Sequence, residues 1–250
     1  MSDGTSATAA AIAQAADGYT YLLFGEQHDN QNHKEAVAQI IQALVDRGRI
    51  VSVGLEMFTR PNQGNLYNWS LGKWDESTFI EQSNWKSQWG FDYSIYRPMF
   101  EAVKQNRLPL VALNIPREWV RTVSRNGPES LPAEAREQVP PIDTNNKDHQ
   151  AVFGALMGGH PPSDGMKNIY AAQVLWDVAM ADSALKAMNR WPHNPKRIMV
   201  ILAGSGHVMY GQGINYRLHQ QAGVNSLSVI GVDSSQSVRS GIGDYTYVGG

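Results

Sequence analysis

The chain has 250 residues, enough for one large domain, and 42% of them are hydrophobic, which allows a sizeable core. The net charge of −2 gives no global attraction to nucleic acid, and the absence of cysteine excludes disulfides, thiolate metal sites and a cysteine nucleophile. No apolar run approaches the roughly 18 residues of a membrane span. We therefore expect no nucleic-acid partner and no transmembrane segment.

Residues 1–18 are rich in Ala, Ser and Thr, which predicts a flexible N-terminal arm or a short Ala-rich helix. Residues 19–250 are expected to form a single α/β domain. The N-terminus lacks the basic start and the leucine-rich centre of a signal peptide. Two expectations for the compartment follow: cytoplasmic, or periplasmic or attached to the cell envelope as a lipoprotein if a leader has been removed.

The first part of the domain has the pattern of a strand–helix–strand unit. Tyr19–Gly25 is almost entirely apolar, as expected for a strand buried on both faces. Asn30 can cap a helix that runs to about Arg47, and His33 near its start is expected in solvent. Ile50–Glu56 is the next strand. Such a unit implies parallel pairing of its two strands.

Residues 59–107 are different in character, with ten aromatic residues between Tyr67 and Phe100. We expect short helices there, at Glu76–Gln82 and Tyr96–Gln105, that form an aromatic-rich insertion. Such a group of aromatic residues is more often ordinary core than a cofactor site.

The rest of the chain predicts more strands around a second helical lobe at about residues 127–190. The longest helix of this lobe, Met166–Asn189, is apolar on most sides and so is expected to be buried. The further strands and one more helix are expected at Leu108–Asn114, Arg197–Ala203, Ile214–Gln221 (the helix), Leu227–Val232 and Tyr245–Val248. Together these patterns predict an α/β fold with a mostly parallel central sheet and helices on both faces.

Polar side chains follow four of the predicted strands. Two of them end in Gly-x-x-His, at Gly25-Glu26-Gln27-His28 and Gly204-Ser205-Gly206-His207. The second strand ends at Glu56, and the third is followed by Asn114 and Arg117. Because parallel sheets bind ligands at the carboxyl ends of their strands, we expect these side chains to meet at one edge.

The expected cluster allows two kinds of chemistry. His28, Glu56, His207 and Glu26 could bind a divalent metal such as zinc, manganese or iron. Alternatively, His28, Glu56 and His207 could work without metal, with histidine as base and glutamate orienting it.

Simpler structural roles compete with both kinds of chemistry. A histidine after a strand often only caps the next helix. Glu56 among apolar residues is harder to explain this way, because a buried carboxylate is costly without a partner. Gln173 and Asp177 lie four residues apart on one face of the long helix, so they either support the site or cap nearby backbone. His149 and His160 flank a glycine-rich break and are weaker candidates for the site.

The motifs Gly25-Glu26-Gln27-His28, Gly54-Leu55-Glu56-Met57-Phe58, Ala203-Gly204-Ser205-Gly206-His207-Val208 and Gln173…Trp176-Asp177 together resemble the ChaN-like haem-binding family. This family is related to the Tiki proteases and the erythromycin esterases. The resemblance implies an α/β fold and a haem-binding protein of haem or iron uptake that forms a homodimer. It also implies a tyrosine as the iron ligand, for which the candidates are Tyr210, Tyr96, Tyr93 and Tyr67.

The same resemblance keeps a hydrolase open as the alternative. In the esterase and Tiki branches, the positions that match His28, Glu56 and His207 are catalytic or bind metal, which implies an esterase or a peptidase. One feature departs from the ChaN pattern: those lipoproteins carry a lipidated cysteine near the start, and this sequence has no cysteine.

Overall fold

The computed structural model describes residues 6–159, 164–235 and 239–249. Six strands form one sheet in the order β3-β2-β4-β1-β5-β6, and every described strand pair is parallel. The α/β prediction is thus confirmed, with an all-parallel sheet. The strands are β1 (Tyr21–Glu26), β2 (Ile50–Thr59), β3 (Leu110–Asn114), β4 (Arg197–Gly204), β5 (Ser226–Val232) and β6 (Tyr245–Val248).

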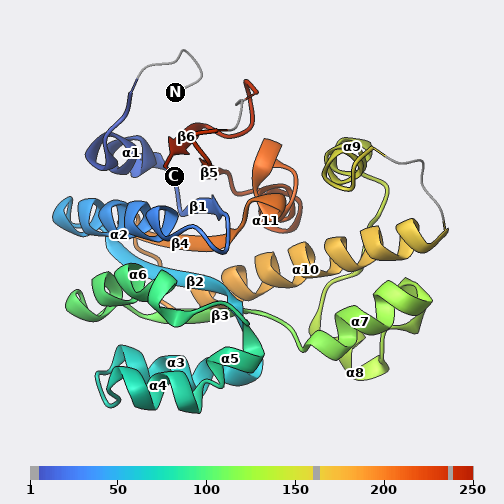
Figure 1. The fold of residues 1–250 in the computed structure, drawn as a ribbon, viewed down its shortest axis with the longest axis horizontal. Coiled ribbons are helices and arrows are strands. Elements are labelled where there is room, and N and C mark those ends of the chain that lie inside the picture. Colours follow the sequence, from blue (N-terminus) through green and yellow to red (C-terminus); the bar gives the residue numbers. More distant parts are fainter. Residues whose placement is uncertain (1–5, 160–163, 236–238, 250) are drawn as a thin grey trace.

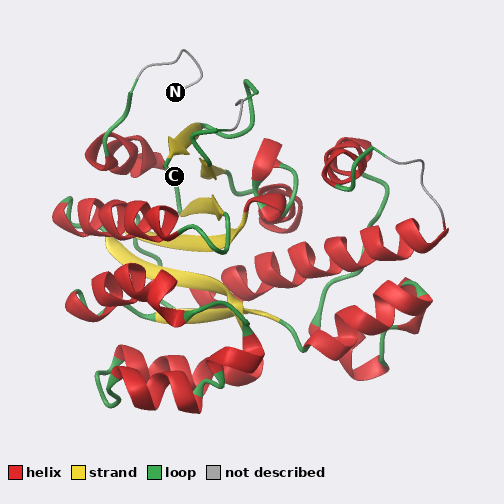
Figure 2. Ribbon diagram, viewed as in Figure 1, coloured by secondary structure: helices red, strands yellow, loops and turns green. Residues whose placement is uncertain are grey.

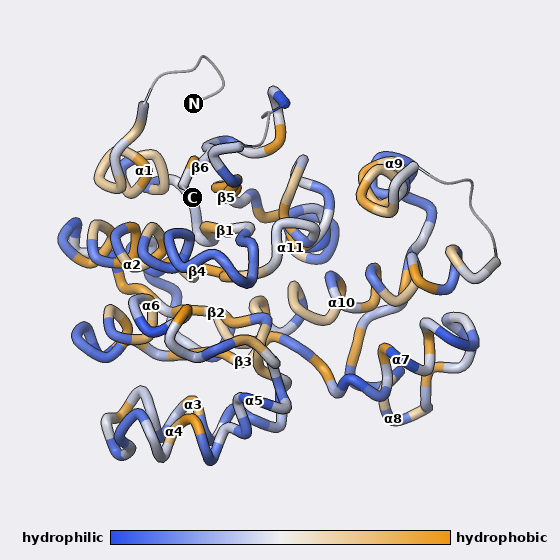
Figure 3. The backbone as a smooth tube through the Cα atoms, viewed as in Figure 1, coloured by the Kyte–Doolittle hydropathy of each residue, from blue (hydrophilic) through white to orange (hydrophobic). Residues whose placement is uncertain are grey.

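Helices cover both faces of this sheet (Figures 1 and 2). Along β1, Leu22 and Phe24 join the core that includes α2 (Gln31–Asp46) and α6 (Tyr93–Gln105), whereas Tyr21 and Leu23 join the core with α10 (Asp164–Asn189) and α11 (Ile214–Ala222). Strands buried on both faces are rich in hydrophobic residues, and orange and pale segments run through the sheet in Figure 3. Among the described residues, no helix is long and apolar enough to cross a membrane.

Residues 9–15 of the N-terminal segment form a packed helix. Helix α1 (Ala9–Ala15) begins after Thr8, whose hydroxyl accepts a hydrogen bond from the backbone N–H of Ala11. Ile12, Ala13 and Ala16 are buried in the core shared with α2. Of the two expectations for residues 1–18, the Ala-rich helix is therefore correct for residues 9–15, because small alanines allow close packing on α2.

The aromatic-rich region forms ordinary core. It contains α3 (Gln63–Ser70), α4 (Glu76–Gln82), α5 (Trp85–Gln88) and α6, the helix that crosses back from β2 to β3 beside α2. Its rings pack on one another: Trp69 stacks on Phe79 with centroids 4.7 Å apart, and Tyr93 stacks on Phe100 at 5.2 Å. The buried rings of this region thus form ordinary hydrophobic core, as expected.

Three helices gather around the part of α10 that extends beyond the sheet (Figure 1). They are α7 (Arg117–Asn126), α8 (Ala133–Gln138) and α9 (Lys147–Leu156). Apolar residues of α7 and α8 pack with Ala172, Leu175 and Ala179 of α10 in a separate small core. Helices α8, α9 and α10 fall within residues 127–190, where a second helical lobe is expected, and α7 lies just before them.

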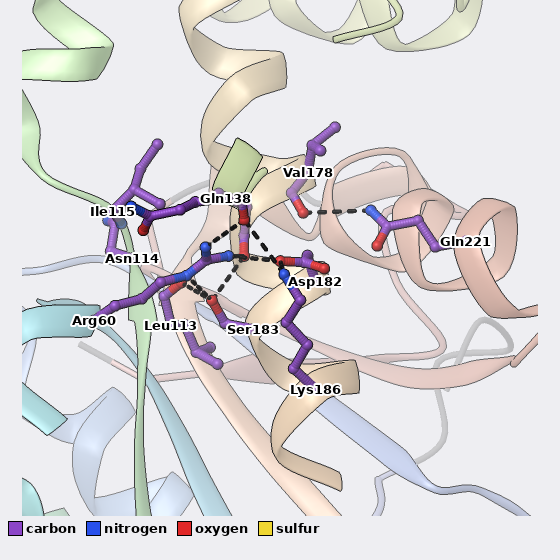
Figure 4. Close-up of polar contacts among 11 residues, drawn as sticks. Arg60, Leu113, Asn114, Ile115, Gln138, Val178, Asp182, Ser183, Lys186 and Gln221 are labelled. Carbon is purple, nitrogen blue, oxygen red and sulfur yellow. Dashed lines mark hydrogen bonds and ion pairs between the residues drawn. The ribbon is translucent and has the colours of Figure 1, made fainter. Parts of the chain in front are cut away.

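The Arg60 side chain connects this lobe to the sheet (Figure 4). Its guanidinium donates to the Asp182 carboxylate at 2.8 Å, to the Ser183 hydroxyl at 2.8 Å and to the Gln138 carbonyl at 2.8 Å. Ser183 in turn donates to the Leu113 carbonyl of β3 at 2.7 Å. One partly buried cation thus links the end of β2, helix α10, the end of α8 and, through Ser183, β3.

Replacing Arg60 with Met is expected to lower the free energy of unfolding by about 2–4 kcal/mol, because Asp182, in a mostly buried position, loses the less exposed of its two cationic partners. Lys186→Met is the matched control, since Lys186 contacts the same carboxylate from an exposed position. Urea denaturation of both variants measures the difference. Equal losses would contradict the role assigned to Arg60.

Candidate functional site

The strand register brings the two Gly-x-x-His segments and Glu56 to the same edge of the sheet. Glu26 of β1 lies opposite Gly204 of β4, and Leu55 of β2 lies opposite Leu202 of β4. Strand β2 continues to Thr59, so Glu56 lies inside the strand and not at its end as expected. The pairing of β2 with β3 becomes irregular after Leu55, where the strand bends past the site.

Glu56 and His207 form the buried centre of the site. Glu56 Oε1 lies 3.4 Å from His207 Nε2, and Glu56 Oε2 accepts a hydrogen bond of 2.6 Å from the Gly204 N–H. Both residues are 8% exposed. A carboxylate in this apolar interior is thus satisfied by one imidazole and one backbone donor.

Helix α10 supplies the second partner of His207. Asp177 Oδ1 lies 2.6 Å from His207 Nδ1, and the amide of Gln173 lies 2.9 Å from the same nitrogen. The other Asp177 oxygen lies 3.4 Å from Nε2 of His149, on α9. Both predicted supporting residues of α10 therefore contact His207, and His149 joins the cluster behind them.

His28 lies on the more open side of the cluster. Its Nδ1 is 2.5 Å from Glu26 Oε1, and its ring packs against Trp89 and Phe91 with centroids 4.6 and 5.2 Å away. The side chain is 32% exposed, compared with 10% for His207. His28 is therefore the imidazole that a ligand can reach most easily.

Glycine is required at position 204 for the two histidine segments to meet. A Cβ atom there would lie 2.9 Å from His28 Cε1, 3.3 Å from His28 Nε2 and 3.6 Å from Glu56 Oε2. The first of these distances is shorter than real Cβ atoms show, so any larger residue would displace the ring. The Cε1–Nε2 edge of His28 thus lies against Gly204, close to the Glu56 carboxylate.

The charges of this cluster depend on one another. Burial alone would lower the pKa of His207, but the carboxylates of Glu56 and Asp177 outweigh it and raise the pKa to about 10. Burial alone would raise the pKa of Glu56, but His207, then His28 and the Gly204 N–H, lower it to about 2. For His28, burial is likewise outweighed by Glu26, so its pKa is raised. At neutral pH His207 is a cation between two anions.

The four candidate metal ligands do not form a metal site in this structure. Their donor atoms pair with one another, His28 with Glu26 and His207 with Glu56 and Asp177, instead of converging on one point. Within the described ranges, no group of three or more His, Cys, Asp or Glu side chains is arranged to hold a metal ion.

The remaining predicted supporting residues lie nearby with structural contacts. Asn114 donates to the Glu56 backbone carbonyl at 3.0 Å, so it supports the strand and not the carboxylate. Arg117 donates to the Ser87 carbonyl at 3.3 Å. His160 lies outside the described residues. These contacts give Asn114 and Arg117 no part in the His/Glu cluster itself.

Sequence reasoning missed two buried residues at the start of α2. Lys34 and His33 are both fully buried, although His33 was expected in solvent. His33 Nδ1 accepts a hydrogen bond of 3.1 Å from the Gln27 N–H, while Asn30 uses its amide to reach the Gly249 carbonyl instead of capping the helix. A signal was present, because Lys34 is in phase with the apolar positions 37, 41 and 44.

The four candidate tyrosines differ strongly in accessibility. Tyr96 and Tyr93 are buried; burial raises the pKa of both, and Tyr96 donates to Glu26 at 3.2 Å. Tyr67 is 59% exposed and borders a cavity of about 850 Å³ beside β3. Tyr210 is half-buried, has a left-handed backbone with φ of +57°, and borders a second cavity of about 750 Å³. Only Tyr67 and Tyr210 can meet a ligand without repacking.

Because folding raises the pKa of His207 above its ordinary 6.5, its contribution to stability is complete below pH 6.5 and is lost as the pH rises through about 10. The contribution of Glu56, whose pKa is lowered, is complete above pH 4.5 and is lost toward pH 2. We therefore expect the cluster to stabilise the fold most between pH 4.5 and 6.5.

The variant His207→Asn should reverse the acid side of this profile. It leaves two buried carboxylates without their cation, so its stability should already fall as the pH rises from about 4 to 7. Denaturation at several pH values measures both profiles, with the exposed His193→Asn as control. A His207→Asn profile parallel to that of the wild type would refute the charge assignment.

Comparison with known proteins bears on the family and the fold. The family model described as "Haem-binding uptake, Tiki superfamily, ChaN" matches residues 12–218. Cofacial haem-binding ChaN of Campylobacter jejuni is 18% identical, with a TM-score of 0.71, and the match covers 94% of this chain and 89% of that chain.

Two more distant structures share the fold. The type III effector HopBA1 is 10% identical with a TM-score of 0.54, covering 97% of this chain and 93% of that chain. A mutant of the erythromycin esterase EreC is 15% identical with a TM-score of 0.52, covering 92% and 76%. No curated protein sequence matches significantly. The family model spans most of the chain, and the chain therefore belongs to the ChaN family of haem-binding uptake proteins in the Tiki superfamily.

Proposed function

We propose that this protein binds haem and takes part in haem or iron uptake. The observation that carries the proposal is membership of the ChaN family over residues 12–218. The resemblance of the fold to ChaN of Campylobacter jejuni, whose structure contains cofacial haem, adds support.

The cavity beside β3 offers features that suit haem. Its volume of about 850 Å³ lies within the roughly 300–1,000 Å³ of typical ligand sites, and it is lined by Tyr67, Trp191 and the apolar edge of β3. Lys186 and Arg190 also line it and could pair with the carboxylates of haem. The exposed phenol of Tyr67 is the donor that would hold the iron, and haem bound there would supply its own redox and ligand chemistry.

Haemin added to the purified protein is expected to give a saturable shift of the Soret band. Tyr67→Phe should weaken binding at least tenfold, because the phenol oxygen would be lost and the ring kept. Tyr210→Phe is the matched variant at the second accessible tyrosine. Sedimentation with and without haemin tests the proposed homodimer. A titration without saturation would remove the haem proposal, and a loss confined to Tyr210→Phe would move the ligand to that residue.

The geometry at the strand ends favours hydrolysis as a second candidate function. Each of two imidazoles has a carboxylate at Nδ1, Glu26 for His28 and Asp177 for His207, which is how a catalytic histidine is oriented. His28, the more exposed ring, would act as the base. His207, charged at neutral pH, would stabilise a developing negative charge.

For this second function, wild-type protein is expected to hydrolyse a carboxylic ester or a peptide, and His28→Ala should be slower by about 10²–10⁴-fold, the usual contribution of a general base. His193→Ala, which changes an exposed histidine, serves as control. Pretreatment with a chelator tests the metal-dependent version. Equal rates for wild type and His28→Ala would exclude this use of the site.

A further inference from the structure

A lysine is buried directly behind the more exposed histidine of the site. Lys34, on the first turn of α2, is fully buried, including its side chain. Its ammonium pairs with Glu26 and lies 4.5 Å from the centroid of the Tyr96 ring. Taking an ammonium out of water is costly, so these contacts must compensate for a large desolvation penalty.

The turn after β1 is built around this ammonium. Besides its contact with Glu26, Lys34 Nζ donates to the backbone carbonyls of Gln27 at 2.6 Å, His28 at 3.0 Å and Asn30 at 3.2 Å. Three carbonyls of one short turn therefore point inward to a single cation. Without the cation the His28 and Asn30 carbonyls would lose this donor, while the Gln27 carbonyl would keep only the Asn30 N–H at 3.1 Å. The shape of the turn that carries His28 therefore depends on Lys34.

Glu26 connects the lysine to the histidine. One of its carboxylate oxygens pairs with Lys34, and the other is 2.5 Å from His28 Nδ1 and accepts from the Tyr96 hydroxyl at 3.2 Å. The Glu26 side chain has no exposed surface. Burying a carboxylate is costly unless it is paired, and Lys34 is the ammonium that pairs with it.

We propose that Lys34 is a positioning residue for His28: it pairs with Glu26 and holds the turn, so that the imidazole donates its Nδ1 proton to Glu26 and presents its Cε1–Nε2 edge to Gly204. This inference concerns the site of the second proposed function and rests on it for its catalytic meaning. The position and hydrogen bond of the His28 ring can be tested without an activity assay.

The groups that face His28 come from several elements and define what else could affect the ring. They are Glu26 of β1, Glu56 of β2, Lys34 of α2, and the rings of Trp89 and Phe91 before α6. The Lys34 ammonium contacts Glu26, the turn carbonyls and the Tyr96 ring. Its charge also acts directly on the imidazole and lowers the pKa of His28, against the larger effect of Glu26. The orientation of the ring depends on Lys34 through Glu26 and the turn.

The experiment is ¹H–¹⁵N NMR of the histidine side chains at one pH near 7. In wild type we expect two strongly downfield Nδ1 protons, from His28 hydrogen-bonded to Glu26 and from His207 hydrogen-bonded to Asp177; His28→Asn and His207→Asn assign them. In Lys34→Met and Lys34→Gln the His28 signal should be lost or move upfield, while the His207 signal stays as an internal control. Lys34→Arg, which keeps the charge, should restore the His28 signal.

The two neutral variants distinguish the loss of the positive charge from the loss of hydrogen bonds to the turn. Both remove the charge, but the amide of Lys34→Gln can still donate to the turn carbonyls. An unchanged His28 signal in either folded variant would overturn the proposal. If both variants fail to fold, the double variant Glu26→Gln with Lys34→Met decides between two explanations. If the double variant folds, the unpaired Glu26 carboxylate caused the failure, which supports the proposal. If the double variant also fails to fold, Lys34 is needed for the core as such, which overturns the proposal. Failure of the ester and peptide assays would leave this result unaffected.

Discussion

The pairing of the Glu56 carboxylate with the His207 imidazole is the interaction on which the rest of the site depends. It joins β2 to the segment after β4, and Asp177 adds α10 as a third element. None of these charged groups would be tolerated alone at this depth, because each needs an opposite charge or a donor within contact distance. The sheet edge is therefore fixed by mutual compensation and not by packing alone.

A second cluster of charged side chains, around His28, is stabilised by mutual pairing in the same way. Glu26 lies between Lys34 and His28 much as Asp177 lies behind His207. The two histidines nevertheless differ in surroundings, because His207 lies between two carboxylates and is nearly buried, whereas His28 contacts one carboxylate, two aromatic rings and solvent. The two histidines therefore differ in the charges that surround them and in how easily a ligand can contact them.

The sequence was sufficient to predict the fold class and the meeting of the two Gly-x-x-His segments, because continuous apolar strands imply parallel pairing and parallel strands share one carboxyl edge. It was not sufficient for Lys34, since a lysine at a helix start is normally solvated and its burial depends on Glu26 from another element. Asn30 also followed tertiary context, because its amide reaches Gly249, a partner 219 positions away in the chain. Likewise, the burial of Tyr93 and Tyr96 follows from how α3–α6 pack, which residue spacing does not determine.

The two proposed functions need not compete, because they use different surfaces. Tyr67 lies on α3 and borders a cavity formed with the outer edge of β3 and the end of α10. His28 and His207 follow the ends of β1 and β4, and Glu56 lies beside them within β2. None of the three lines that cavity. Haem binding at Tyr67 would thus leave the imidazole cluster free. The cost of burying several charges there is then a reason to look for a role of that cluster in its own right, since a haem site at Tyr67 gives no account of it.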